Sequence, residues 1–116
     1  IYTLSLHDAL PIFIHVSVEV MPEFIGGTAA LMKYLSSNIK YPTISQETGS
    51  QGKVIVQFVV DKDGTISNPE VVRGVDPYLD KEAIRVISSM PKWTPGVQNG
   101  KKVRVKFTVP VSFRLQ

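Results

Sequence analysis

Apolar and polar residues alternate without a break through the last part of the chain, from Val103 to Leu115. This period of two predicts a long β-strand with one buried face. Pro110 lies in its middle and has no N–H to give to a neighbouring strand, so we expect the strand to lie at an edge of its sheet. Peptide-binding modules use such an edge, with its unpaired backbone groups, to capture an extended partner.

Apolar residues at helical spacing predict a first helix after Gly26-Gly27-Thr28, with Thr28 as the expected N-cap. The helical pattern continues to about Lys40. Tyr41-Pro42 then ends the helix, because the residue before a proline is disfavoured in the α region. The apolar positions of this helix are Ala30, Leu31, Tyr34, Leu35 and Ile39.

A β-hairpin is predicted next, with one strand from Lys53 to Asp61 and another from Thr65 to about Arg73. Asp61-Lys62-Asp63-Gly64 has the composition of a hairpin turn, since glycine readily takes a positive φ. An Asp-rich loop could also suggest calcium, but the glycine and glutamate positions of an EF-hand are not in place. Pro69 in the second strand indicates an edge or a bulge.

The second helix is predicted to begin at Asp76-Pro77, where the carboxylate can cap it and the proline suits the first helical position. Its apolar stripe comprises Leu79, Ala83, Val86, Ile87 and Met90, and Pro91 ends it. The segment from Lys92 to Lys102 is expected to be a connection. Within it, Trp93 is interpreted as a core residue, because large aromatic side chains mostly bury their area.

The order helix, hairpin, helix and strand predicts an α+β domain in which two helices cover one face of a three-stranded antiparallel sheet. The strand from Lys53 to Asp61 contains no proline, so we expect it to lie centrally between the two proline-bearing strands. This arrangement leaves one side of the C-terminal strand free to accept another strand.

The first residues of the chain are treated separately from the domain. Residues 1–12 have no sustained period, resemble translated sequencing-adapter sequence, and are excluded from the fold as a non-domain leader. Residues 13–21 are expected to form a short strand or an extended lead-in. The domain itself is placed at residues 22–116. Because the chain begins with Ile1, we expect it to be a piece of a longer protein.

Composition narrows the function classes for a chain of 116 residues. A hydrophobic content of 43% is sufficient for one core. There is no cysteine, so disulfides and thiolate zinc sites are excluded. The formal charge of +3 is too small for a dedicated nucleic-acid binder. No nucleophile, base and orienting acid converge, and His15 alone is more often structural, so we expect no catalysis, cofactor or metal.

A family resemblance rests on short pieces that occur in a fixed order along more than four-fifths of the chain. They are Pro22-Glu23-Phe24, Gly26-Gly27, Asn38-Ile39-Lys40-Tyr41-Pro42, Gly52-Lys53-Val54-Ile55-Val56-Gln57-Phe58, Asp63-Gly64, Val71-Val72-Arg73-Gly74, Asp80-Lys81-Glu82-Ala83, Trp93-Thr94-Pro95-Gly96 and the final strand. Together they resemble the C-terminal domain of the bacterial energy transducer TonB, in its Bacteroidetes-type form. Ile25 departs from the pattern, which has proline there.

The resemblance implies a periplasmic module of a protein anchored in the inner membrane. Domains of this family bind the TonB box, a short extended segment of TonB-dependent outer-membrane receptors, by adding it as a strand to their sheet. The missing N-terminal part would contact inner-membrane proton-channel motor proteins. Strand addition through backbone hydrogen bonds makes few demands on side-chain identity, which suits a module that serves many receptors.

Two areas are predicted to bind this partner. One is the helix end, with Asn38, Lys40, Tyr41 and Pro42. The other is the C-terminal strand, with Val103, Arg104, Val105, Lys106, Phe107, Thr108, Val109, Val111, Ser112 and Phe113. Simpler interpretations remain open: basic residues on a strand often form only a solvated face, and Tyr41-Pro42 can serve only to end the helix and pack on the sheet.

Two other functions also remain open. The domain could be the interaction module of a membrane metallopeptidase or sensor fusion, whose chemistry would lie upstream. Alternatively, its exposed strand could pair with a second copy of the chain, giving a strand-exchanged homodimer.

Overall fold

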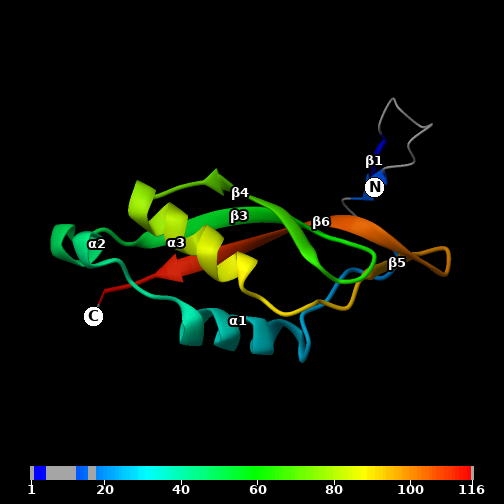
Figure 1. The fold of residues 1–116 in the computed structure, drawn as a ribbon, viewed down its shortest axis with the longest axis horizontal. Helices are drawn as coiled ribbons and strands as arrows, with labels where there is room; N and C mark the ends of the chain where they lie inside the picture. The colour runs from blue at the N-terminus through cyan, green and yellow to red at the C-terminus, as the bar shows by residue number, and fades with distance from the viewer. Residues whose placement is uncertain (1, 5–12, 16–17, 116) are drawn as a thin grey trace.

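The computed structural model of the chain describes residues 2–4, 13–15 and 18–115 (Figure 1). Its strands run in the order β1-β2-β6-β3-β4, and β5 also pairs with β6. The strands are β1 (Tyr2–Leu4), β2 (Phe13–His15), β3 (Gly52–Val60), β4 (Ile66–Arg73), β5 (Gly96–Gln98) and β6 (Lys101–Phe113), and the helices are α1 (Gly27–Asn38), α2 (Thr43–Thr48) and α3 (Pro77–Ser88). The predicted α+β class is confirmed, with β3 central between β4 and β6.

The core lies between the sheet and the helices α1 and α3. β3 and β6 are antiparallel in unbroken register from Gly52↔Phe113 to Val60↔Val105. Along β6, alternate residues from Val105 to Phe113 turn toward the core, as the period of two predicts. Figure 1 shows α3 lying across the sheet and α1 running along its β6 side. The helices contribute the buried residues Leu31, Leu35, Leu79, Ala83, Val86 and Ile87.

The β3–β4 hairpin follows the prediction closely. Gly64 closes the turn with φ 89°, and its N–H donates to the Asp61 carbonyl. The register with β3 shifts between Gln57↔Glu70 and Val59↔Ser67, so two residues of β4, Asn68 and Pro69, stand opposite one residue of β3. Pro69 therefore lies in a bulge on an edge strand.

The ends of α1 differ from the prediction. Gly26 is the N-cap, with φ 94°, and the expected cap Thr28 already lies inside the helix. The left-handed conformation of Gly26 lets the chain enter the helix earlier, with the Gly27 N–H bonded to the Phe24 carbonyl. The helix also ends earlier than expected, at Asn38, because the backbone of Lys40 is bonded to α3.

Two elements occur where the prediction had only connections. α2 follows Pro42 directly and ends at Gly49, whose φ is 74°. β5 forms inside the expected connection from Lys92 to Lys102, because Asn99 and Gly100 both take positive φ and turn the chain into a hairpin with β6. β6 accordingly starts at Lys101 rather than Val103.

The N-terminal segments add strands to this sheet. β2 pairs in parallel with β6 through Ile14↔Arg104 and His15↔Val105, as the lead-in prediction for residues 13–21 allowed. β1 pairs with β2, so the expectation that residues 1–12 form no element is wrong for Tyr2–Leu4. The rest of that leader, residues 1 and 5–12, lies outside the described residues. None of the described helices is long and apolar enough to cross a membrane.

Candidate functional site

The backbone of β6 is paired along one side and open along part of the other. Pro110 stands opposite Ile55 in an unbroken antiparallel register, yet it has no N–H to donate. The Ile55↔Pro110 pair must therefore belong to the alternate pairs that exchange no backbone hydrogen bonds. It follows that the N–H and C=O groups of Lys106, Thr108 and Ser112, and the Pro110 carbonyl, point away from β3.

This open edge is shorter than the sequence suggests. Val103 pairs with Gly96 of β5, and Arg104 and Val105 pair with β2. The predicted open edge from Val103 to Phe113 is thus wrong over its first three residues. Within the part of the chain that the structure describes, the remaining stretch from Lys106 to Phe113 is paired with β3 alone. We call this stretch the β6 edge.

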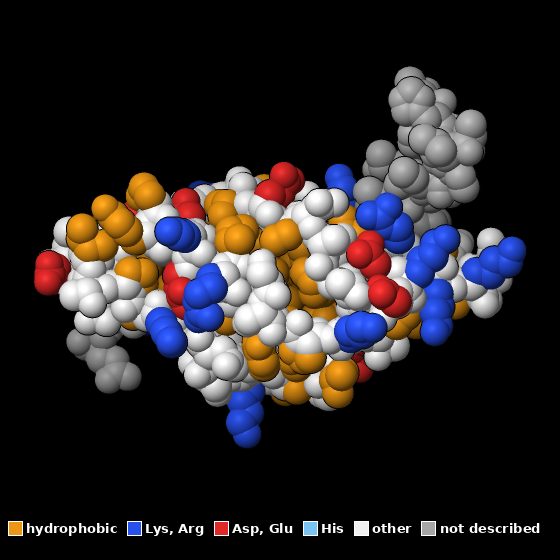
Figure 2. Space-filling model, viewed as in Figure 1, with side chains coloured by type: hydrophobic (Ala, Val, Ile, Leu, Met, Phe, Trp, Pro, Cys, Tyr) orange, Lys and Arg blue, Asp and Glu red, His pale blue; other side chains and the backbone are white. Residues whose placement is uncertain are grey.

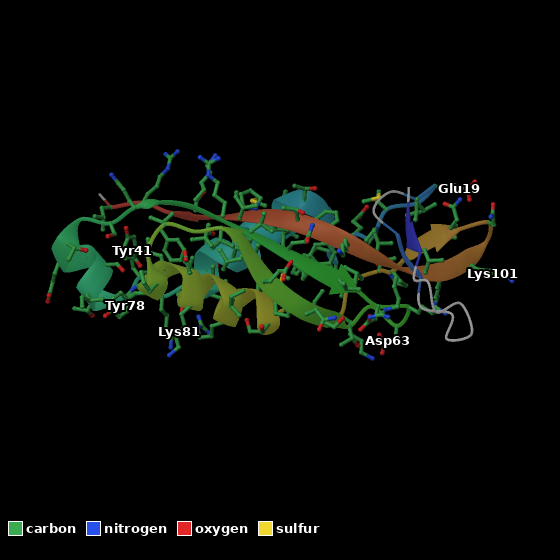
Figure 3. All side chains as sticks on the ribbon, turned by 90° about the horizontal axis from the view of Figure 1, so that it is seen from above. Glu19, Tyr41, Asp63, Tyr78, Lys81 and Lys101 are labelled. Atoms are coloured by element: carbon green, nitrogen blue, oxygen red, sulfur yellow. The ribbon has the colours of Figure 1, made fainter. Side chains whose placement is uncertain are left out.

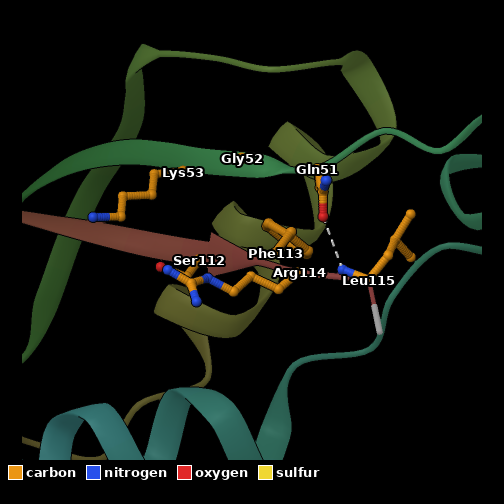
Figure 4. Close-up of a pocket in the computed structure, with 7 residues that line it drawn as sticks. All are labelled: Gln51, Gly52, Lys53, Ser112, Phe113, Arg114 and Leu115. Carbon is orange, nitrogen blue, oxygen red and sulfur yellow. Dashed lines mark hydrogen bonds between the residues drawn. The ribbon is translucent and has the colours of Figure 1, made fainter.

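Three hollows follow the β6 edge along its length. Phe107 lines one of about 470 Å³, together with Pro22, Leu31 and Trp93. A narrow one of about 80 Å³ separates Pro110 and its neighbours from side chains of α1, among them Leu35, and from Ile39, which follows the helix. The third, of about 450 Å³, lies at the carboxyl end of the strand (Figure 4). This third hollow includes Gly52 and Lys53 of β3 in its lining, so it lies over the paired β3 and β6 strands. The first two lie toward α1, where an extended segment beside β6 would find space for side chains.

The end hollow brings basic side chains to the carboxyl end of the β6 edge. Lys53 and Arg114 line it, along with Phe113, and Gln51 accepts a hydrogen bond from the Leu115 N–H at 3.1 Å (Figure 4). Arg104, at the other end, is engaged instead: its Nε lies 2.9 Å from Asp61 Oδ1, and both side chains are half-buried. The open interpretation of the basic strand residues as a solvated face therefore does not hold for Arg104.

The predicted helix end is held to α3 by its backbone. Arg85 Nη2 donates to the Asn38 carbonyl at 2.8 Å, and the Lys40 N–H donates to Glu82 Oε2 at 2.6 Å. Arg85 also binds both Glu82 oxygens, each at 2.7 Å. Burial favours the neutral form of Glu82, but the bonds from Arg85 and Lys40 prevail and lower its pKa. These contacts fix the position of the helix end.

Tyr41 packs on the sheet, as one of the two sequence interpretations expected. Its ring meets Phe113 edge-to-face, with centroids 5.5 Å apart, and its hydroxyl donates to the Ser50 carbonyl. Burial and the nearby Asp76 carboxylate raise the pKa of this hydroxyl. Because Tyr41 packs on Phe113, the helix end and the β6 edge meet at that residue. Tyr41 and Pro42 also line a pocket of about 400 Å³ with residues of α3.

Trp93 is a core residue, as predicted. It is 3% exposed and packs against the rings of Phe24, Phe58 and Phe107. Its Nε1 is buried without a hydrogen-bond partner.

The Asp61–Gly64 segment is a turn, in which Asp63 accepts a hydrogen bond from the Thr65 N–H. Across the described ranges, no group of three or more His, Cys, Asp or Glu side chains is placed to hold a metal ion.

Sequence reasoning missed two features that shape the edge. Asn99-Gly100 is a strong hairpin signal, and it would have shown that β5 covers the start of β6. The parallel pairing of β2 with β6 left no local signal, because a contact between residues ninety positions apart depends on tertiary structure.

Comparisons with known proteins agree with this fold. The family model for the C-terminal region of Gram-negative bacterial TonB proteins matches residues 37–115. The protein TonB of Haemophilus influenzae is 33% identical over 91 residues, which cover 75% of this chain and 34% of that protein. The chain thus spans about a third of this relative's length. The solution structure of the Helicobacter pylori TonB C-terminal domain has a TM-score of 0.58 at 24% identity, over 74% of this chain and 90% of that one.

Proposed function

The chain belongs to the family of Gram-negative TonB C-terminal domains, and we propose that its β6 edge binds the TonB box of outer-membrane receptors as an added β-strand. The observation that carries this proposal is the outward-facing backbone of Lys106, Thr108, Pro110 and Ser112. Each backbone hydrogen bond gained contributes about 0.5–1.5 kcal/mol net, so a few of them give useful affinity with little dependence on sequence.

The proposed site combines the β6 edge with the helix end. Phe113 joins the two areas, because Tyr41 packs on its ring and Phe113 also lines the end hollow with Gln51 and Arg114. Of the predicted partner-binding residues, we retain Lys106 through Phe113 together with Asn38, Lys40, Tyr41 and Pro42. We place no catalytic step and no cofactor on this domain.

In the whole protein, the domain would act as the periplasmic end of an energy transducer anchored in the inner membrane. Motor proteins would act through a part outside this chain, and proton-motive force would reach the receptor as a pull on the added strand. The fusion with a metallopeptidase or sensor remains an alternative for the parent protein, with the same edge serving a different partner.

The proposal is tested by titrating a labelled TonB-box peptide against the 116-residue chain. The substitution Thr108→Pro removes one outward N–H and places a ring where the partner strand would lie, so binding should fall at least about tenfold. The matched control is Lys62→Pro in the β3–β4 turn, away from the edge. Equal affinity of wild type and a folded Thr108→Pro variant would contradict strand addition at β6.

Self-association through the same edge is a second candidate, favoured by the length of unpaired strand. It predicts that the apparent mass rises with protein concentration and that Thr108→Pro keeps the chain monomeric. Sedimentation over a hundredfold concentration range separates this behaviour from peptide binding by a monomer.

A further inference from the structure

The pocket between the helix end and α3 lies apart from the strand edge and has its own chemistry. It has a volume of about 400 Å³. Figure 3 shows Tyr41, Tyr78 and Lys81 close together at this end of the molecule. The pocket is lined by Lys40, Tyr41, Pro42, Thr43, Tyr78, Lys81, Glu82 and Arg85.

The charges around this pocket do not balance. Glu82 is its one acidic residue, and both of its oxygens are occupied by Arg85 and by the Lys40 N–H. Arg85 is occupied in turn by Glu82 and the Asn38 carbonyl. Lys40 and Lys81 are exposed, and neither side chain takes part in an ion pair among the described residues. Three basic residues of the lining, Lys40, Lys81 and Arg85, thus stand against the single carboxylate of Glu82, whose pKa the Lys40 charge also helps to lower, and the pocket keeps an excess of positive charge.

The walls of the pocket are apolar and held in place. Tyr41 is fixed by its contacts with Phe113 and Ser50. Tyr78 is 51% exposed, so its ring is accessible at the pocket wall. Figure 2 shows Lys and Arg side chains gathered over α3, beside hydrophobic side chains at the α2 end of the molecule.

We infer that this pocket docks an acidic peptide segment in which an apolar side chain lies between carboxylates. The apolar side chain would pack against Tyr41, Pro42 and Tyr78, while the carboxylates would meet Lys40 and Lys81. Charge complementarity selects this occupant, because a basic segment would be repelled and a neutral one would leave the two lysines unpaired. The pocket shares Lys40, Tyr41 and Pro42 with the helix end of the proposed site, so the inference rests on that proposed function and extends it to Tyr78 and Lys81 of α3.

The test is an amide NMR titration of the 116-residue chain with the peptide acetyl-Glu-Leu-Glu-amide. We expect shifts at Lys40, Tyr41 and Thr43 and along Tyr78–Arg85, and a loss of binding in about 0.5 M NaCl, where charges are strongly screened. The twin acetyl-Gln-Leu-Gln-amide should bind at least about fivefold more weakly. Equal affinity for both peptides would overturn the inference, as would shifts confined to the β6 edge.

Matched variants locate the site. Lys40→Glu with Lys81→Glu should weaken binding about tenfold, whereas Lys62→Glu in the distant turn should leave it unchanged. Tyr78→Ala should weaken it and Tyr78→Phe should not, because the ring makes the contact. Thr108→Pro should bind the acidic peptide normally even where it fails to bind a TonB-box peptide. If the Lys40→Glu, Lys81→Glu double variant does not fold, Lys40→Gln with Lys81→Gln serves instead. Unchanged affinity of this second double variant for the acidic peptide would contradict the site.

Discussion

Ile55 and Pro110 face each other across β3 and β6 in a pair that exchanges no backbone hydrogen bond. This single relationship sets the direction of every backbone group along the strand, because the register on either side of the pair is unbroken. The backbone N–H and C=O groups of the odd-numbered residues of β6, from Val105 to Phe113, point toward β3. The backbone groups of the even-numbered residues between them point away from β3. A proline is therefore tolerated at one position and harmful at the next.

The first prediction compares proline at two adjacent positions. Val109→Pro removes an N–H that pairs with β3 at Val56, leaving a buried carbonyl unsatisfied, and should lower the free energy of unfolding by about 1–3 kcal/mol. Thr108→Pro removes an outward N–H and should cost less than about 1 kcal/mol. Urea denaturation of both variants checks this. Equal destabilisation would show that the assigned direction of the β6 backbone is wrong.

The second prediction concerns two glycines with positive φ. Gly64 has φ 89°, and a Cβ added there would collide with the Trp93 carbonyl oxygen. Gly100 has φ 74°, but a Cβ there would meet nothing within 4 Å. Gly100→Ala should therefore cost about 1 kcal/mol for conformation alone. Gly64→Ala should cost at least about 1 kcal/mol more, because the turn must move away from Trp93. Thermal unfolding measures the difference, and similar costs would argue against this packing.

The third prediction concerns Glu82, which is 9% exposed and joins α3 to the helix end. Glu82→Gln weakens the bonds to Arg85 and to the Lys40 N–H, and should lower the free energy of unfolding at pH 7 by about 1.5–3 kcal/mol. The control Glu47→Gln, on the exposed side of α2, should change it by less than about 0.5 kcal/mol. Comparable losses in the two variants would show that the Glu82 contacts contribute little.

The fourth prediction is a pH dependence set by Asp76. Its carboxylate accepts the Leu79 N–H at 2.7 Å and the Ser45 hydroxyl at 3.0 Å, and the bond from Leu79 lowers its pKa. The folded state thus binds the proton less readily than the unfolded state, whose pKa is about 3.9. The stabilisation is present above that value and is lost as the pH falls through the lower folded pKa.

Asp76→Asn isolates this effect, because the amide oxygen can still cap α3 but cannot titrate. Its stability should fall less steeply than that of the wild type between about pH 5 and pH 2. Asp76→Ala should cost about 1 kcal/mol at pH 7 through loss of the cap. If the free energy of unfolding of wild type and of Asp76→Asn fell equally steeply with pH over this range, the pH dependence would belong to other groups.

Local patterns predicted the main elements of the fold, because each has a strong local cause. The alternation along β6, the Asp76-Pro77 start of α3 and the Asp61–Gly64 turn are all confirmed. Asn99-Gly100 and the Pro42 to Gly49 segment carried signals for β5 and α2 that a closer examination of turn chemistry could have found.

The limits of the open edge could not be predicted from local patterns. They depend on where β2 and β5 meet β6, and on the ion pair that holds Arg104 to Asp61, all of which are contacts between distant residues. The pocket between the helix end and α3 is another such case, since Lys40 and Lys81 are brought together only by packing. The limits of the domain, placed at residues 22–116, stay a prediction.

Hydrogen exchange of the β6 amides, with and without a bound TonB-box peptide, tests strand addition most directly. In the free protein, the amides of Phe107, Val109 and Val111 should already be protected by β3, while those of Lys106, Thr108 and Ser112 exchange faster. Peptide binding should slow exchange at Thr108 and Ser112 at least about tenfold and leave the β3-paired amides nearly unchanged. Saturating peptide with no added protection at these outward amides would contradict the account.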